Sequence, residues 1–235
     1  RKDMDAGTNR IPAYEVNKFL YSLSLPLMFL LATYVYLKKF FFGQLKTNLC
    51  WFDGFSHRCR RIKETASSWE SLDILYNHCN GEYGWLTDFW LNIRNSQAVR
   101  NRKILVKEKL MEAAREMGEN SPLILSVACG SAQAIIEFLA ENSGGDFRPR
   151  AILLDIDPAA LQHARVLAGH YGVEGRVDFV QGSVKNIRRT MQAWPKPHIV
   201  ETVGLLDYFS DERVVALLHS VYELMVHGGR LITGN

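Results

Sequence analysis

The sequence predicts an α/β protein with a doubly wound, mostly parallel sheet, preceded by a helical region and one transmembrane helix. Three observations carry this prediction. Residues 123–234 alternate short apolar runs with helical patterns, which is typical of a parallel sheet covered on both faces. Residues 19–37 are uncharged and strongly apolar. The residues between these two regions carry apolar positions at helical spacing.

We expect four segments: an N-terminal flank at residues 1–16, a transmembrane helix at 17–42, a helical juxtamembrane region at 43–118 and the sheet domain at 119–235. A chain of 235 residues with 47% hydrophobic residues can bury one full core beside an appendage. The formal net charge of +3 comes without a dense basic stripe, which argues against nucleic acid as a partner.

The four cysteines do not form a tight framework, so we interpret them as reduced thiols. Four side chains of the kinds that bind zinc lie in the first half of the chain: His57, Cys59, His78 and Cys79. Their spacing fits no zinc-finger pattern, and we expect no metal.

The membrane segment reads FLYSLSLPLMFLLATYVYL from Phe19 to Leu37. A bilayer core requires about 20 mostly apolar residues in a helix, because the backbone must satisfy its own hydrogen bonds in lipid. A signal peptide would end in a small-residue cleavage site, whereas this run ends in Lys38, Lys39 and three phenylalanines. A buried core helix is the other alternative. Basic residues crowd the C-terminal side, which predicts a cytosolic main domain.

The juxtamembrane region should be helical. Residues 59–79 carry one apolar stripe, residues 85–93 form a short aromatic helix or turn, and residues 96–118 form a long amphipathic helix between a Ser96 N-cap and a Gly118 C-cap. Five aromatic residues of this region could line a substrate pocket or pack the helices against the sheet: Trp51, Trp69, Tyr83, Trp85 and Trp90. Packing is favoured, because apolar stripes at helical spacing usually belong to a core.

Beyond Asn120 we expect strands at residues 123–127, 151–156, 177–182, 198–204 and 230–234, with helices at 132–141, 158–172 and 211–229. Ligands of such sheets bind beyond the carboxyl ends of the strands, near the point where the strand order reverses.

Two acidic residues follow the second strand. Asp155 ends it, about 23 residues after Ala132, and an acid at this place and distance can hold the two hydroxyls of a ribose; a solvated strand end is the alternative. Asp157 precedes Pro158, which predicts a helix N-cap. Gly182, Ser183 and Val184 end the third strand, where a base could lie or the chain could simply turn.

The motifs SVACGSA, LLDIDPAALQHA, FVQGSV, GLLDYFSD and HGGRLITGN together resemble the class I S-adenosylmethionine-dependent methyltransferases. Within that family the sequence is most similar to the bacterial branch that makes 3-hydroxy fatty acid methyl esters. The resemblance covers residues 95–235 and leaves the membrane segment outside it. It implies a Rossmann-like methyltransferase sheet and S-adenosylmethionine as cofactor. Taken together with the uncharged run and its basic flank, the bacterial branch leads us to expect a single-pass protein of the bacterial inner membrane.

The resemblance also implies roles for particular residues. Ala128, Gly130 and Ala132 stand at the glycine positions of the cofactor loop, and Asp155 matches the acid that binds ribose. The remaining matches are Ser183 and Val184 on the adenine side and Thr202, Val203 and Gly204 facing the methionine part. Asp207 and Tyr208 lie just after the fourth strand, and this position makes them candidates for substrate contact. For Asp207 and Tyr208, helix capping and packing remain the alternative.

Several positions depart from the family pattern. Ser126 stands where an acid is usual, His198 stands where the fourth strand usually begins with Asp, and Glu201 places a charge inside that strand. Alanine replaces glycine twice in the cofactor loop, which adds methyl groups where the backbone turns tightly. Family members continue after the fifth strand with a helix and an antiparallel strand pair. This sequence stops at Asn235, just after its fifth strand, so we expect it to lack these C-terminal strands.

Two functions follow as expectations. The first is a membrane-anchored methyltransferase acting on a lipophilic acceptor, either an acyl carboxylate or a hydroxylated ring. The protein would mainly position the two reactants, and only a hydroxyl acceptor would need a base. The second is a non-catalytic subunit that caps a larger integral membrane complex, respiratory or photosynthetic, because a fold alone does not fix a function. The expected partners are the lipid bilayer and either a small lipophilic substrate or integral membrane proteins.

Overall fold

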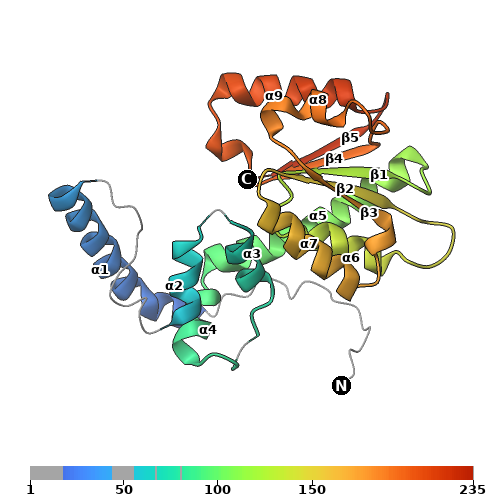
Figure 1. The fold of residues 1–235 in the computed structure, drawn as a ribbon. Helices are drawn as coiled ribbons and strands as arrows, with labels where there is room; N and C mark the ends of the chain where they lie inside the picture. The colour runs from blue at the N-terminus through green and yellow to red at the C-terminus, as the bar shows by residue number, and fades with distance from the viewer. Residues whose placement is uncertain (1–17, 44–55, 67, 80, 235) are drawn as a thin grey trace. The chain divides into compact units, whose positions relative to one another are not determined.

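The structure is a computed structural model that describes residues 18–43, 56–66, 68–79 and 81–234. The chain divides into two compact units (Figure 1). One contains residues 1–67 and 74–101, and the other contains residues 68–73 and 102–235. Each unit is described by itself.

The first unit begins with the helix predicted for the membrane, α1 (Lys18–Phe42). Its hydropathy meets the criterion for a span over Leu25–Phe42, and none of that window is buried against protein. Large apolar side chains are therefore exposed along it, including Phe29 at 72% and Phe40 at 73%. A helix is thus confirmed at the predicted position, and by length and composition it is long and apolar enough to cross a bilayer.

Three short helices follow, α2 (His57–Glu64), α3 (Trp69–Tyr76) and α4 (Trp85–Leu91). The apolar stripe predicted over residues 59–79 is thus shared by two helices. The Ser56 side chain caps α2 by accepting from the Cys59 amide at 3.3 Å.

The prediction of Ser96 as an N-cap is wrong. The long helix α5 (Arg94–Met117) begins two residues earlier, and the buried Ser96 hydroxyl instead donates to the Trp90 carbonyl at 3.3 Å. The predicted C-terminal stop at Gly118 is confirmed, because Gly118 has a φ of +64°, the left-handed conformation that glycine adopts most easily.

The second unit is built on a parallel five-stranded sheet in the order β3-β2-β1-β4-β5. The strands are β1 (Leu123–Val127), β2 (Arg150–Asp155), β3 (Val177–Gln181), β4 (Ile199–Val203) and β5 (Arg230–Gly234). The order reverses between β1 and β4, so the crevice beyond these two strands is the expected ligand site. The predicted doubly wound sheet is confirmed.

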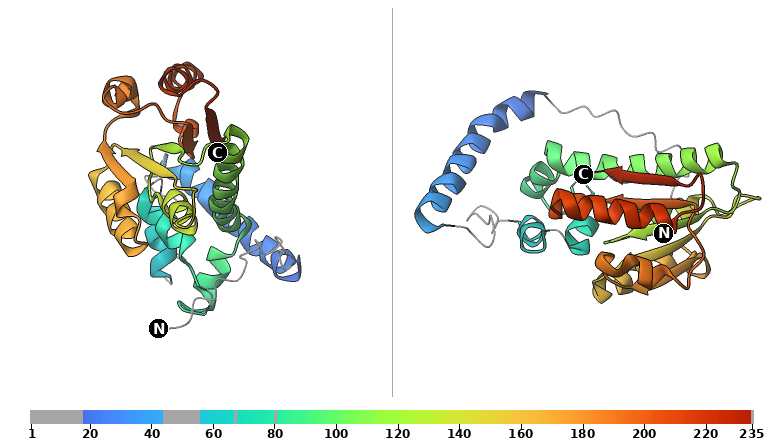
Figure 2. Two further views of the ribbon diagram at one scale, coloured as in Figure 1. Left: turned by 90° about the vertical axis from the view of Figure 1, so that its right-hand side faces the viewer. Right: turned by 90° about the horizontal axis from the view of Figure 1, so that it is seen from above.

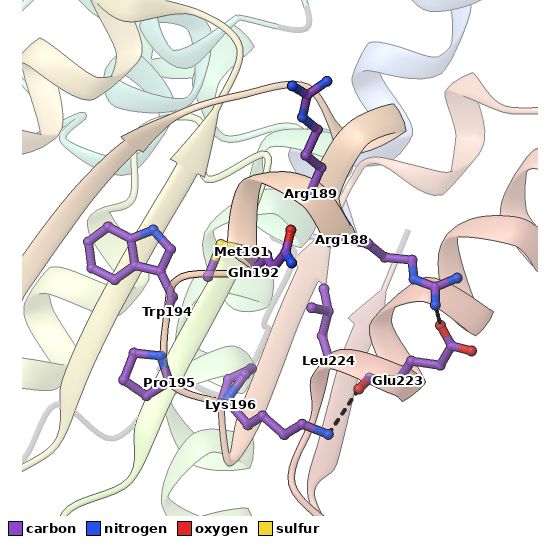
Figure 3. A pocket seen from close by; sticks show the side chains of 10 residues that line it. Arg188, Arg189, Met191, Gln192, Trp194, Pro195, Lys196, Glu223 and Leu224 are labelled. Carbon is purple, nitrogen blue, oxygen red and sulfur yellow. Dashed lines mark hydrogen bonds and ion pairs between the residues drawn. The ribbon is translucent and has the colours of Figure 1, made fainter.

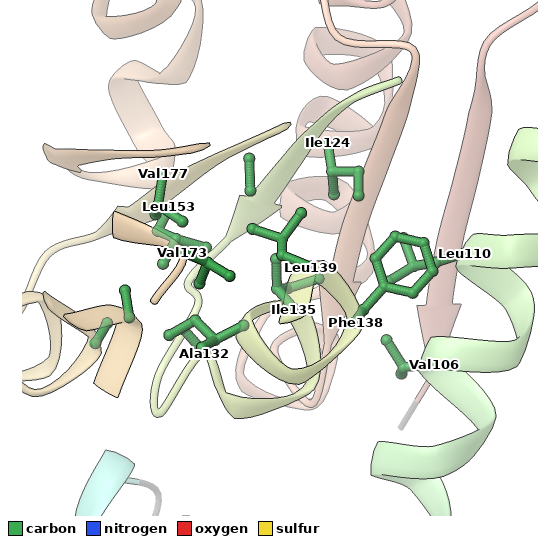
Figure 4. Close-up of a cluster of buried hydrophobic side chains, with 14 of the residues drawn as sticks. Val106, Leu110, Ile124, Ala132, Ile135, Phe138, Leu139, Leu153, Val173 and Val177 are labelled. Carbon is green, nitrogen blue, oxygen red and sulfur yellow. The ribbon is translucent and has the colours of Figure 1, made fainter. Parts of the chain in front are cut away.

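Helices cover both faces of this sheet (Figures 1 and 2). On one face lie the later part of α5, α6 (Gln133–Glu141) and α7 (Pro158–His170); on the other lie α8 (Ile187–Met191) and α9 (Asp211–Leu224). The core on the α5–α6–α7 face centres on Leu110, Ile124 and Phe138, all nearly inaccessible to solvent (Figure 4). Such burial supplies most of the favourable free energy of folding.

The predicted end of the last helix is also wrong. The helix expected at residues 211–229 ends at Leu224, and Met225 is extended and buried. The backbone after Leu224 bonds to the segment before β4 instead. The Val226 amide donates to the Pro197 carbonyl at 3.1 Å, and the Arg230 amide donates to the His198 carbonyl at 3.0 Å. These bonds start β5, and they compete with continued helix.

Candidate functional site

The loop after β1 has an alternating left-handed backbone. Ala128, Gly130 and Ala132 have φ values of +55°, +53° and +53°. This region costs an L-residue about 1–2 kcal/mol, so the two alanines hold a strained conformation that glycine would adopt freely. Strain of this kind is usual at ligand-binding loops. The positions that the resemblance assigned to glycine therefore keep the glycine-like backbone.

Asp155 joins this loop to the end of β2. One carboxylate oxygen, Oδ2, accepts from the Gly130 amide at 2.9 Å, and Oδ1 accepts from the Asp157 amide at 2.9 Å. Asp155 is only 8% exposed. A carboxylate has about four acceptor positions, so two remain after these bonds, enough for a pair of hydroxyls. Asp157 caps α7 as predicted, by accepting from the Ala159 amide at 2.9 Å.

The β3 side of the site is shaped by a close approach at Gly182. A β-carbon there would lie 2.9 Å from Thr190 Cγ2 and 3.2 Å from Leu154 Cδ1, so any other residue would force these side chains to shift. Ser183 caps the short 3₁₀ helix η3 (Val184–Asn186), because its hydroxyl accepts from the Lys185 amide at 3.3 Å. Ser183 and Val184 thus lie beyond the end of β3, as expected for an adenine-side loop.

The β4 side contributes Thr202, Val203 and Gly204. Thr202 is fully buried, and its hydroxyl has no hydrogen-bond partner among the residues that the structure describes. Gly204 has a φ of +76°, and a β-carbon there would lie 3.3 Å from Arg102 Nη1 on α5. The absence of a side chain at Gly204 therefore makes room for the Arg102 guanidinium.

Two of the departures from the family pattern contact each other on the neighbouring strands β1 and β4. Ser126 and Glu201 are register partners, and the Ser126 hydroxyl donates to Glu201 Oε2 at 2.5 Å. Burial raises the pKa of Glu201 to about 7, against the lowering effects of the Ser126 hydrogen bond, the Arg102 charge and the Val203 amide.

The third departure, His198, has a different role. Its Nδ1 accepts from the Leu123 amide at 3.0 Å at the opposite end of the same strands. This contact helps to fix the start of β4 beside β1, away from the candidate site.

Cys129 lies within the cofactor loop. Burial, together with the charges of Asp155 and Glu201, raises the pKa of its thiol well above the usual value. The thiol therefore stays protonated near neutral pH, and a thiolate nucleophile is not expected here.

Leu72 of α3 lies close to the loop at Gly130. Leu72 Cδ1 would lie 3.4 Å from a β-carbon on Gly130. Trp69 stacks on His163 of α7 with ring centroids 4.2 Å apart, and Asp73 lies 3.6 Å from His163 Nε2. Trp69 therefore packs onto the sheet unit beside the site. Two other aromatics pack within the first unit, Tyr83 against Arg58 and Trp90 against Phe89, while Trp51 lies outside the described residues.

Asp207 and Tyr208 belong to the 3₁₀ helix η4 (Leu206–Tyr208), which follows β4. Both are exposed, Tyr208 at 61%. They lie beyond the carboxyl end of β4, as expected for substrate contact, and their assigned role stays a prediction.

A cavity of about 500 Å³ lies elsewhere, beside α8 and the segment that leads into β4 (Figure 3). Arg188, Lys196 and Glu223 rim it, and Arg188 and Glu223 form an ion pair. Because its lining residues 194–197 precede β4, the cavity lies toward the amino end of that strand. It contains none of the predicted site residues, and the crevice rule favours the opposite edge of the sheet.

The sequence did not identify Arg102 and Leu72 as site residues, and it treated Glu201 only as an anomaly. Glu201 carried a usable signal, a charge inside a buried strand, which usually has a functional reason. The sequence holds no comparable signal for Arg102 and Leu72, because their proximity to Gly204 and Gly130 depends on how α5 and α3 pack.

Comparisons with known proteins agree with this architecture. A family model described as "Putative methyltransferase" matches residues 28–235. Among solved structures, the chain is similar to a possible exported protein from Bordetella parapertussis, with 19% sequence identity, a TM-score of 0.66 and coverage of 77% of this chain and 59% of that one. The chain thus spans about three fifths of that protein's length, and the similarity shows a shared fold.

Two further similar structures contain S-adenosyl-L-homocysteine. One is an S-adenosylmethionine-dependent methyltransferase from Geobacter sulfurreducens, with 18% identity, a TM-score of 0.43 and coverage of 54% of this chain and 46% of that one. The other is an RNA methyltransferase from Salinibacter ruber, with 18% identity, a TM-score of 0.40 and coverage of 55% and 75%, respectively.

Proposed function

The chain belongs to the family described as "Putative methyltransferase", and we propose that it is a membrane-anchored, S-adenosylmethionine-dependent methyltransferase that acts on a lipophilic acceptor. The observation that carries the proposal is the contact between Asp155 Oδ2 and the Gly130 amide at 2.9 Å. It joins a left-handed loop to a buried acid at the carboxyl ends of adjacent parallel strands, where nucleotide ligands bind.

The residues present fit this cofactor. Asp155 keeps acceptor positions for the ribose hydroxyls after bonding two amides. Ser183 and Val184 follow β3, where an adenine would lie, and the buried Thr202 hydroxyl lacks a partner among the described residues. An unsatisfied buried hydroxyl is costly, so a ligand that bonds it would be favoured.

When bound, S-adenosylmethionine supplies a methyl group on a sulfonium, a reactive electrophile whose leaving thioether needs no activation. The protein's residues then act by position: the loop and Asp155 fix the nucleoside, and the acceptor must be aligned with the methyl group. Asp207 and Tyr208 are the proposed contacts on the acceptor side. A carboxylate acceptor needs no base, which favours an acyl carboxylate over a hydroxylated ring.

The lipophilic acceptor is supported by α1 and by the side chains near the loop. Helix α1 exposes large apolar residues over the length of a bilayer core. Leu72 and Trp69 add apolar surface beside Gly130 and His163. These features suit an acyl chain that partitions into the membrane, as in the branch that makes 3-hydroxy fatty acid methyl esters. We propose a place in the bacterial inner membrane, with the sheet unit in the cytosol.

The test measures transfer of labelled methyl groups from S-adenosylmethionine to extracted membrane lipids by the full chain in detergent. Asp155→Asn should reduce cofactor affinity by about 10- to 100-fold, because it replaces a charged acceptor of hydroxyl hydrogen bonds. Asp157→Asn is the matched control, because it makes the same charge change two residues away and asparagine also caps helices. Equal, undiminished affinity in both variants would reject the site.

The non-catalytic function is an outcome of the same experiment. A protein that purifies in stoichiometric amounts with a large membrane complex, and that neither binds cofactor nor transfers methyl groups, would be a structural subunit. A lone protein with cofactor-dependent transfer would be an enzyme.

A further inference from the structure

We propose that Glu201 and Arg102 together hold the amino-acid end of the cofactor, so that β4 supplies the carboxylate that β1 lacks. The inference rests on the proposed function, since it assigns part of the same site. It explains two departures from the family pattern, Ser126 on β1 and the charge of Glu201 within β4, by a single binding role.

The register of the sheet carries the first step. Ser126 and Glu201 are direct partners on neighbouring parallel strands, and their side chains are joined by a 2.5 Å hydrogen bond. Side chains of register partners leave a sheet on the same face. The Glu201 carboxylate therefore lies on the same face of the sheet as the Ser126 side chain, on the two strands between which the strand order reverses.

The surroundings of Glu201 carry the second step. The residue is 8% exposed, and burial raises the pKa of its carboxyl to about 7 despite the Ser126 hydroxyl, the Arg102 charge and the Val203 amide. A buried carboxylate is costly unless a cation compensates it. A ligand ammonium at this position would complete the compensation that the protein alone leaves partial.

Arg102 carries the third step. Its Nε is buried without a hydrogen-bond partner among the described residues, and its guanidinium lies against Gly204, where a β-carbon would come within 3.3 Å of Nη1. Buried donors of this kind are normally satisfied. A guanidinium binds carboxylates with two parallel hydrogen bonds, and a ligand carboxylate would use this unfilled capacity.

Glu201 and Arg102 thus offer opposite charges near the carboxyl end of β4. An α-amino acid carries an ammonium and a carboxylate on one carbon atom, which is the complementary arrangement. The chemistry recognised is a zwitterionic amino-acid end attached to a nucleoside thioether.

The experiment compares two probes on the full chain in detergent: S-adenosylhomocysteine, and 5′-methylthioadenosine, which has the nucleoside and thioether without the amino-acid end. Glu201→Gln keeps the size of the side chain and an acceptor for Ser126. It should weaken binding of S-adenosylhomocysteine by about 10- to 100-fold and leave binding of 5′-methylthioadenosine nearly unchanged. Arg102→Gln should behave in the same way.

A double variant that moves the carboxylate from β4 to β1 distinguishes loss of ligand recognition from loss of folding. The double variant Ser126→Asp/Glu201→Gln returns the carboxylate to β1 and should restore most of the lost affinity for S-adenosylhomocysteine. Thermal unfolding of each variant reports whether the sheet unit stays folded.

The other outcomes separate this inference from the proposed function. If the parent binds both probes and Glu201→Gln binds S-adenosylhomocysteine as tightly as the parent, the inference is overturned and the proposed function stands. Equal weakening of both probes would also overturn it, because Glu201 would then act on the nucleoside or on the fold. A parent that binds neither probe overturns the proposed function and the inference with it.

Discussion

The buried carboxyl of Glu201 opposes folding at the candidate site. The carboxyl accepts a hydrogen bond from the Ser126 hydroxyl. Its titratable neighbours are the Arg102 guanidinium and the Cys129 thiol. Burial makes ionisation of this group unfavourable. The folded protein therefore becomes less stable as the pH rises through the titration of Glu201.

The pH dependence of this cost can be predicted. The pKa of Glu201 is about 7 in the folded chain against an ordinary value of 4.5, so the unfolded chain loses the proton first. Glu201 then costs nothing below pH 4.5, and the cost grows to at most about 3 kcal/mol above pH 7. Urea unfolding should show Glu201→Gln to be more stable than the parent at pH 8 and nearly equal to it at pH 4.5. A difference that does not change with pH would contradict this environment for Glu201.

Ala128 offers a second prediction at the residue scale. Its φ of +55° is strained for alanine and free for glycine, so Ala128→Gly should raise the free energy of unfolding by about 1 kcal/mol. Ala134 lies in right-handed helix α6, where Ala134→Gly should lower stability by about 1 kcal/mol. Denaturant unfolding of both variants measures the contrast. Destabilisation by both would show that the loop is not left-handed at Ala128.

Helix α5 is positioned over the sheet by an ion-pair network with α6. Lys103 Nζ lies 2.6 Å from Glu137 Oε1, Lys107 Nζ lies 3.1 Å from Glu137 Oε2, and Gln133 donates to Glu137 at 2.7 Å. Burial alone would favour protonated Glu137, but the hydrogen bonds and charges of these neighbours leave its pKa below the usual value. The network therefore also stabilises the helix that carries Arg102.

Loss of the network should destabilise the sheet unit. Glu137→Gln leaves Lys103 and Lys107 without their buried carboxylate and should cost about 3 kcal/mol at pH 7. The parent's advantage should be present above pH 4.5, the ordinary pKa, and fade as the pH falls through the lowered pKa. Glu112→Gln is the matched control, because Glu112 pairs with Lys109 on the exposed side of α5, where ion pairs contribute at most about 1 kcal/mol. Equal effects of the two changes in urea unfolding would contradict the network's role.

At this scale the sequence predicted more of the fold than of the site. All five strands were predicted to within one residue at each end, because short, mainly apolar runs between turn signals are typical of strands. Helix α8 was missed, since IRRTM is too short to show a helical period. The contact between Ser126 and Glu201 could not be read from their separation of 75 residues, because it depends on which strands are neighbours and on their register. The proximity of Arg102 to Gly204 depends in the same way on packing.

At the scale of the whole molecule, the proposed function depends on whether α1 holds the chain in a membrane. Its exposed apolar surface predicts that the chain stays with membranes after washing with alkaline carbonate, which removes peripheral proteins. A chain without residues 1–45 should move to the soluble fraction or bind only loosely. Release of the full chain by carbonate would contradict the transmembrane assignment and weaken the case for a lipophilic acceptor.

The central claim is that the carboxyl edge of β1, β2 and β4 binds S-adenosylmethionine. Amide hydrogen exchange of the full chain, with and without S-adenosylhomocysteine, tests it most directly. We predict slower exchange in the segments 128–132, 155–157 and 183–186, and unchanged exchange around the cavity rimmed by Arg188 and Glu223. Slower exchange at that cavity alone, or no change anywhere at saturating ligand, would contradict the claim.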